Sequence, residues 1–434
     1  MNEALTSARL APHDRTAPTD WAAGAMRRRL RRRYAAERRF RWLGLGAFLL
    51  AAGFLVFLLA TIVRDGWNSF RSTEVEVAVR LDPATLGVPP GARDPDVLAR
   101  ADFQAAVADS AARAGLPPFV VSDGAWLAVR DRLVRDPALL GQTVPMWLTA
   151  QSHIDLLAKG AFDLAQDPAD LTVSEAEIAT YRELKEAGRL RTTLNLHFLT
   201  GTDSVDPELA GIWGALKGSF LVLLVTFALS FPVGVFAAIY LEEFAPRNRL
   251  TDVIEVSINN LAAVPSIIFG LLGLAVFLNT LNMPRSAPVV GGLTLALMTL
   301  PVIVVSARAA LKAVPPSIRD AALGVGASPM QVVFHHVLPL ALPGVLTGTI
   351  IGLARALGET APLLMIGMRA FITSVPQGFT DPATVLPVQI FIWSDNVQRG
   401  FVEKTSGAII VLLLFLLLMN SVAIYLRNRL EVRW

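Results

Sequence analysis

Residues 337–366 read VLPLALPGVLTGTIIGLARALGETAPLLMI, and this stretch decides the fold. Its thirty residues carry only two formal charges, Arg355 and Glu359, and a bilayer is crossed by about 20 apolar residues. On a helix these charges lie four residues apart, on one face and within reach of each other. A charge at membrane depth costs at least about 2.5–3.5 kcal/mol, so it normally faces a polar pathway or a partner. We therefore expect a transport role for the pair. The alternative is an ion pair kept for packing.

The composition indicates a membrane protein. Of the 434 residues, 53% are hydrophobic and 17% are charged, whereas soluble domains have about 25% charged residues. The chain contains no cysteine, which excludes disulfides, iron–sulfur clusters and thiol catalysis. Five histidines argue against a histidine-rich metal site.

Six spans are predicted, which makes the chain an all-α polytopic protein of the cytoplasmic (inner) membrane. The first, Trp42 to Val63, follows nine arginines between Arg27 and Arg41 and is interpreted as a signal anchor. The arginine block is a topology signal beside the bilayer, so no nucleic-acid partner is expected. The other spans start at about Trp213, Val253, Pro288, Val337 and Ser406. Basic residues after the even-numbered spans place both termini in the cytoplasm.

Residues 64–210 form a predicted extracytoplasmic insertion. They carry 14 basic and 22 acidic residues, a net charge of −8, and the remainder of the chain is basic. Apolar spacing predicts helices at 96–115, 126–136 and 173–188, and alternation predicts strands at 74–81 and 194–199 that lie close together. The expected organisation is a basic tail (1–41) with its first twenty residues disordered, the first span (42–63), a mostly helical α+β insertion (64–210) and a transport core (211–434).

The longest predicted cytoplasmic loop, between spans four and five, reads AVPPSIRDAALGVGASPMQVVFHHVLPLALPG at 313–344. It predicts a short helix at about 315–327, on which Ala321 and Ala322 keep one side flat. Gly326 permits a chain reversal. A flat small-residue helix suits docking into a groove of a partner, and the alternative is a plain connecting helix. His335 and His336 are adjacent and point about 100° apart, which is poor for joint metal ligation.

This loop resembles the cytoplasmic signature of ABC importer permeases: E-A-A, three residues, G, nine residues, I, one residue, L-P. The matching residues are Asp320, Ala321, Ala322, Gly326, His336, Leu338 and Pro339. Asp320 replaces the family's Glu, and His336 replaces an apolar residue. The resemblance implies a type I ABC importer permease fold, in which Asp320, Ala321, Ala322 and Gly326 contact a cytoplasmic ATPase.

A second resemblance narrows the family. The run RALGETAP at 355–362 is similar to the fifth-span signature R-A-x-G-E-T-A-P of A-type permeases of the phosphate-uptake (Pst) system. IYLEEFAP at 239–246 and two longer segments agree in order, from about Gly211 to the C-terminus. The first 210 residues match only a longer variant with an additional domain. The resemblance implies that Arg355 and Glu359 move phosphate. A guanidinium fork suits a tetrahedral oxyanion, and Thr360 offers a hydroxyl donor.

The expected function is therefore the permease subunit of an ATP-driven phosphate importer. The chain lacks a Walker A pattern, so we expect no enzymatic activity and no cofactor, with ATP and Mg bound by a partner. The expected partners are an ABC ATPase dimer, a second homologous permease, an extracytoplasmic phosphate-binding protein and the lipid bilayer. The alternatives are a permease for phosphonate, sulfate or molybdate, an ATP-independent channel or secondary transporter, and a membrane-anchored receptor.

Overall fold

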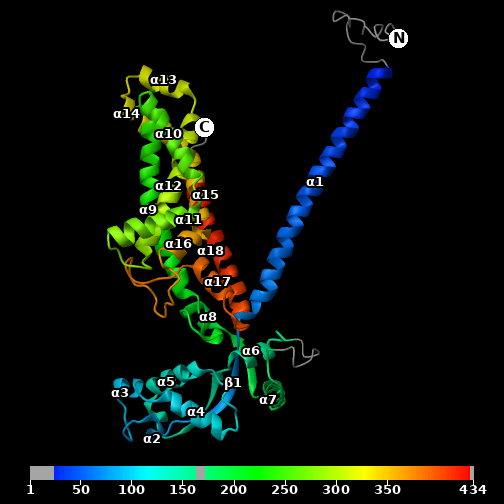
Figure 1. The fold of residues 1–434 in the computed structure, drawn as a ribbon, viewed down its shortest axis with the longest axis vertical. Helices are drawn as coiled ribbons and strands as arrows, with labels where there is room; N and C mark the ends of the chain where they lie inside the picture. The colour runs from blue at the N-terminus through cyan, green and yellow to red at the C-terminus, as the bar shows by residue number, and fades with distance from the viewer. Residues whose placement is uncertain (1–23, 163–171, 431–434) are drawn as a thin grey trace, which may run out of the picture. The chain divides into compact units, whose positions relative to one another are not determined.

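The computed structural model describes residues 24–162 and 172–430 (Figure 1). Within these residues, five helices are long and apolar enough to cross a membrane, and one bent helix pair makes a sixth candidate span. The predicted disorder of the first twenty residues lies outside the described residues. The five helices are α1 (Gly24–Gly66), α9 (Trp213–Ile239), α12 (Pro288–Lys312), α15 (Leu338–Gly358) and α18 (Gly400–Leu430).

The third predicted span is the bent pair. It consists of α10 (Arg249–Ala262) and the stretch Ser266–Thr280, which begins with α11 (Ser266–Gly273), and the two parts differ in direction by 99°. Pro265 explains the break, because it has no N–H to donate to Leu261 and pushes the preceding residue out of the helical region. The predicted start of this span at about Val253 falls within α10, and the size of the bend was not predicted.

The last span begins earlier than predicted. α18 starts at Gly400, not at Ser406, so Glu403 and Lys404 lie in its first turns. The predicted start at about Ser406 leaves Lys404 in the preceding loop. Both residues are buried, with relative exposures of 7% and 1%. Burial of charges at the start of a span requires partners from elsewhere in the chain.

Small residues let the core helices approach closely. α12 packs against α9 and α15. A Cβ added at Gly234 of α9 would lie 2.8 Å from Ile303 of α12, and a Cβ at Gly218 would collide with the carbonyl oxygen of Thr384. In lipid, apolar side chains gain little by leaving their surroundings, so the helices associate mainly through close packing of this kind.

Residues 67–212 contain a small antiparallel sheet and a set of short helices. The strand order is β2 (Thr143–Thr149), β1 (Arg71–Arg80), β3 (Leu190–Leu194). Val75, Val77 and Val79 alternate into a core that α4 covers. The helices predicted at 126–136 and 173–188 are confirmed as α5 (Trp126–Arg135) and α7 (Glu175–Glu186), whereas the one predicted at 96–115 is divided into α3 (Pro95–Ala99) and α4 (Phe103–Arg113). The remaining helices are α2 (Pro83–Leu86), α6 (Ser152–Ala158), α8 (Leu196–Thr200), α13 (Pro316–Gly324), α14 (Pro329–Gln331), α16 (Ala361–Met365) and α17 (Leu386–Ser394).

One of the two strand predictions is wrong in position. β1 covers most of the predicted 74–81, but the strand expected at 194–199 ends at Leu194. Asn195 starts helix α8 instead, because its side-chain oxygen accepts a hydrogen bond from the backbone N of Phe198 at 2.9 Å. The predicted proximity holds, since Arg71 at the start of β1 pairs with Leu194 at the end of β3.

We predict that Gly218→Ala lowers the stability of the helical core. The new methyl group meets backbone rather than a movable side chain, and overpacking of this kind costs about 1–3 kcal/mol. A lower melting temperature of the detergent-solubilised protein would report it. Gly324→Ala at the end of α13 is the matched control, because no atom lies within 4 Å of the added methyl group. Equal melting temperatures for the two variants would contradict the prediction.

Candidate functional site

The helix that carries Arg355 ends between Arg355 and Glu359. α15 stops at Gly358, and Glu359 has an extended backbone with φ −79° and ψ 122°. Pro362 accounts for this end, because it has no N–H for the carbonyl of Gly358 and its ring would clash with that carbonyl. The sequence had indicated one helical face for both charges. The structure instead places Arg355 on the last turn and Glu359 just beyond it.

The two charged side chains make a loose contact. Arg355 Nε lies 3.5 Å from Glu359 Oε1, at the limit of a hydrogen bond. The Arg355 side chain is 51% exposed, whereas the Glu359 side chain is 18% exposed. Thr360 is half-buried and immediately precedes α16. The guanidinium therefore keeps most of its donors free for another partner.

The two broken spans meet at their second halves. α16 follows the break at Glu359 and packs against α11, which follows the break at Pro265. A Cβ at Gly270 of α11 would lie 2.6 Å from Cα of Pro362, so only glycine permits this approach. Interrupted helices at membrane depth are tolerated where protein or a cavity satisfies the backbone, and transporters use such interruptions to meet polar solutes.

The loop before α15 forms the predicted short helix and reversal. α13 spans Pro316–Gly324, and Gly326 follows with φ +91°, a left-handed conformation that other residues adopt only with strain. Asp320 and Ala321 are exposed, but Ala322 is 6% exposed and packs into the core with Val332. The flat surface expected from both alanines is therefore divided between a free side and a packed side.

A hollow of about 520 Å³ opens between α13 and the start of α15. Its lining is mostly apolar and comes from α13, from the π-helical turn Val332–Val337 and from the start of α15. Val325, which borders it, is 85% exposed. His335 and His336 also border the hollow, and no cluster of metal-ligating side chains is found among the described residues. An exposed apolar hollow rimmed by polar residues is typical of a protein contact.

An ionic brace holds α13 to the end of α9. Arg319 donates to Glu243 Oε1 at 2.6 Å and to the carbonyl oxygens of Val314 and Leu311 at 2.7 and 3.0 Å. The hydrogen bond to Glu243 raises the pKa of Arg319 above its ordinary value. A second arginine, Arg308, donates to Glu255 at 2.9 Å. The Arg319 contacts therefore hold the short helix to the turn after α9 and to the end of α12, and the Arg308 contact joins α12 to α10.

The comparisons agree with this geometry. Residues 230–434 match the family described as "Binding-protein-dependent transport system inner membrane component", and residues 27–167 match a domain of unknown function, DUF3333. The chain is 31% identical over 248 residues to "Probable ABC transporter permease protein YqgI" of Bacillus subtilis (strain 168), which covers 54% of this chain and 83% of that protein. The chain belongs to the binding-protein-dependent transport permeases.

A further relative of this permease is "Phosphate transport system permease protein PstA 1" of Mycobacterium tuberculosis (strain CDC 1551 / Oshkosh). The identity is 30% over 217 residues, covering 50% of this chain and 70% of that protein. The predicted resemblance to A-type permeases with an additional N-terminal region is confirmed. A solved structure of the MetNI methionine ABC transporter matches 51% of this chain and 98% of that chain, at 18% identity and a TM-score of 0.41, too low to bear on function.

The sequence singled out the loop at 313–344 and the run at 355–362, but it did not indicate the ionic brace between α13 and Glu243. Arg308 and Arg319 were read only as topology signals, since their acidic partners lie more than 50 residues away in sequence. The paired Glu242 and Glu243 in IYLEEFAP were the available signal, because two adjacent acids at the cytoplasmic end of a span call for cationic partners. Arg319 and Glu243 are 76 residues apart in sequence, so the spacing of nearby residues cannot show that they are in contact.

We predict that Arg319→Ala loosens α13 and destabilises the permease. The change removes hydrogen bonds from a charged group to Glu243 and to two carbonyls, each worth about 1.5–3 kcal/mol when buried and less here because Arg319 is 22% exposed. Hydrogen exchange of residues 316–326 should accelerate. Arg247→Ala is the matched control, since Arg247 is exposed. Unchanged exchange in the Arg319 variant would contradict the brace.

Proposed function

We propose that this permease moves phosphate inward as the membrane subunit of an ATP-driven importer. The observation that carries the proposal is its similarity to phosphate transport system permeases, at 30% identity over 70% of one such protein. The RALGETAP run at 355–362 lies within the spans that such a subunit provides.

Arg355 is the residue we assign to the anion. It is a half-exposed guanidinium at the end of an apolar helix, only loosely held by Glu359. A guanidinium presents several donors in a plane, which suits the oxygens of phosphate. Glu359 limits how tightly an anion rests there, because conduction requires release as well as entry. Thr360 adds a hydroxyl donor beside the pair.

The proposed partners contact the segment before α15 on one side of the membrane and the pathway at its far end on the other. An ATPase dimer contacts residues 315–327, the proposed coupling segment. Asp320, Ala321 and Gly326 lie on its free side, and Ala322 supports that contact from the packed side. A second permease completes the pathway, and an extracytoplasmic binding protein delivers phosphate. In this arrangement the permease hydrolyses nothing itself and holds no cofactor.

The proposed orientation places both termini in the cytoplasm. Residues 1–41 are then a basic tail, 42–63 the first span, 64–210 the extracytoplasmic insertion and 211–434 the transport core. Another oxyanion, such as sulfate, phosphonate or molybdate, would use the same chemistry. Competition against labelled phosphate uptake distinguishes them: phosphate import predicts that only unlabelled phosphate competes at equal concentration.

We predict that Arg355→Gln abolishes phosphate uptake and leaves the complex assembled. Loss of a charge-assisted contact to an anion is worth about 1.5–3 kcal/mol, so transport should fall by about 10- to 150-fold. Labelled-phosphate uptake and co-purification of the ATPase measure the two effects. Arg285→Gln, on an exposed arginine, is the matched control. Normal uptake by the Arg355 variant would eliminate the assigned role.

We predict that Glu359→Gln slows turnover by about tenfold without affecting assembly. The neutral amide no longer repels the anion bound at Arg355, so release of the anion becomes slower. The maximal uptake rate of assembled complex measures the effect, with the exposed Glu183→Gln as control. If the Glu359 variant fails to assemble, the carboxylate has a packing role instead.

A further inference from the structure

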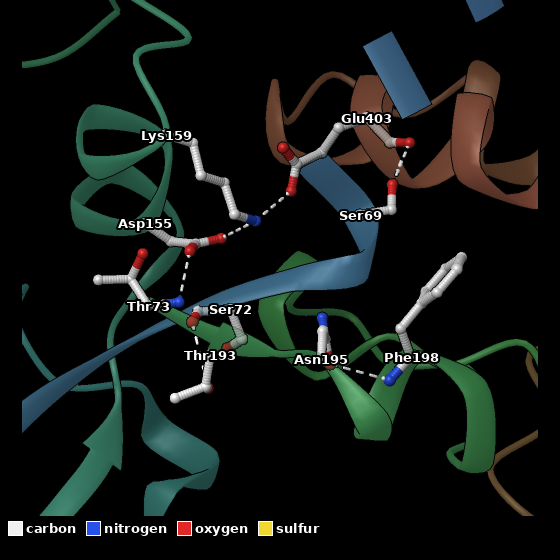
Figure 2. Close-up of polar contacts among 9 residues, drawn as sticks. All are labelled: Ser69, Ser72, Thr73, Asp155, Lys159, Thr193, Asn195, Phe198 and Glu403. Carbon is white, nitrogen blue, oxygen red and sulfur yellow. Dashed lines mark hydrogen bonds and ion pairs between the residues drawn. The ribbon is translucent and has the colours of Figure 1, made fainter. Parts of the chain in front are cut away.

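A buried lysine joins the insertion to the last span. Lys159, just after α6, lies 2.5 Å from Asp155 Oδ2 and 2.7 Å from Glu403 Oε1 of α18, and its side chain is 1% exposed. Figure 2 shows the lysine between the two carboxylates. Burial alone would lower the pKa of Lys159, but the carboxylates of Asp155 and Glu403 outweigh it and leave the pKa raised. The lysine is therefore a charged link between residues 244 positions apart.

The two acidic residues of this link are held in turn by β1 and by the turn before it, one through its carboxylate and the other through its backbone carbonyl. Asp155 Oδ1 accepts a hydrogen bond from the backbone N of Thr73 in β1 at 2.8 Å. The carbonyl oxygen of Glu403 accepts a hydrogen bond from the hydroxyl of Ser69, which precedes β1 (Figure 2). Four segments thus meet at one lysine: α6, β1, the turn before β1, and α18.

On the same face of α18, two glycines are in close contact with neighbouring segments. Gly400 and Gly407 lie one turn on either side of Glu403. A Cβ at Gly400 would lie 2.5 Å from Ser152 Oγ and 2.6 Å from Pro207 Cβ, and a Cβ at Gly407 would lie 2.5 Å from Ser69 Cβ. Beside this face, Arg399 donates to the carbonyl oxygen of Ala161 at 3.0 Å. The charge link is therefore embedded in close packing, which leaves little freedom for sliding.

α18 connects this junction to the helix of the proposed pathway. It packs along α15, and near its other end Arg427 Nη1 lies 3.4 Å from Thr347 Oγ1 of α15. α15 ends beside Arg355. A displacement of the insertion that carried α18 with it would consequently act on α15.

We propose that Lys159 is a positioning residue that makes the insertion and α18 move as one body, so that a partner docking on the insertion acts on α15 and Arg355. The part of the proposal in which docking on the insertion acts on α15 rests on the proposed importer function. The rigid connection does not, because it concerns only contacts within this chain.

The natural absence of cysteine allows a direct test of the connection. Spin labels at Asp131→Cys on α5 and Val402→Cys on α18 occupy exposed positions, with exposed fractions of 53% and 61%. In the purified complex the distance distribution between them should be narrow. Lys159→Met should broaden it, because two buried carboxylates lose their shared cation. Lys185→Met, the same change at an exposed lysine, should leave it narrow. Glu403→Gln provides a milder variant of similar size should Lys159→Met fail to fold.

The second readout is stimulation of the ATPase by the extracytoplasmic phosphate-binding protein. Lys159→Met or Glu403→Gln should reduce this stimulation about tenfold, within the usual range of coupling between distant sites, and leave basal ATPase activity unchanged. An unaltered distance distribution overturns the rigid connection. A broadened distribution with full stimulation overturns transmission. A parent complex without any ATPase overturns the proposed function, and the distance measurement still decides the connection.

Discussion

Backbone groups in hydrocarbon have no water to bond, so each span must satisfy its own N–H and C=O groups or be covered by protein where it does not. Pro265 and Pro362 each lack the N–H that would bond the carbonyl four residues earlier, and a helix ends at or just after that carbonyl. Pro232, Pro301 and Pro343 lack the same N–H but lie inside continuous helices. The short helices that follow the breaks at Pro265 and Pro362 pack together over Gly270, which covers the interruption with protein. The exposed position of Arg355 is a consequence of where the second break falls.

Local signals predicted most of the membrane part. Spans appear in sequence as long apolar runs, and the starts at Trp213 and Pro288 agree with the helices. The coupling segment was predicted at about 315–327 because proline, alanine and glycine each constrain the backbone within one or two residues, and α13 lies inside those limits. The helices of the insertion were found from their periodicity, a property that a single element carries by itself.

Contacts between distant segments account for what was missed. β2 contains Pro145, which argues against a strand in sequence, and its pairing with β1 identifies it as one. The start of α18 was misplaced because hydropathy treats Glu403 as costly, whereas Lys159 neutralises it from another part of the chain. The end of α15 could be suspected from Gly358 and Pro362. The half-exposed state of Arg355 could not, because it depends on which neighbours surround the helix end.

The π-helical turn Val332–Val337 has a consequence for the rotational phase of the permease. Such a turn holds one residue more than an α-turn, and each residue of an α-helix advances it by about 100°. The helix from Pro329 to Gly358 therefore has two phases, one on each side of this turn. A uniform helical wheel drawn through it assigns Arg355 to the wrong face relative to Gln331. The extra residue therefore determines the rotation about the helix axis between the cytoplasmic segment and Arg355 at the end of α15.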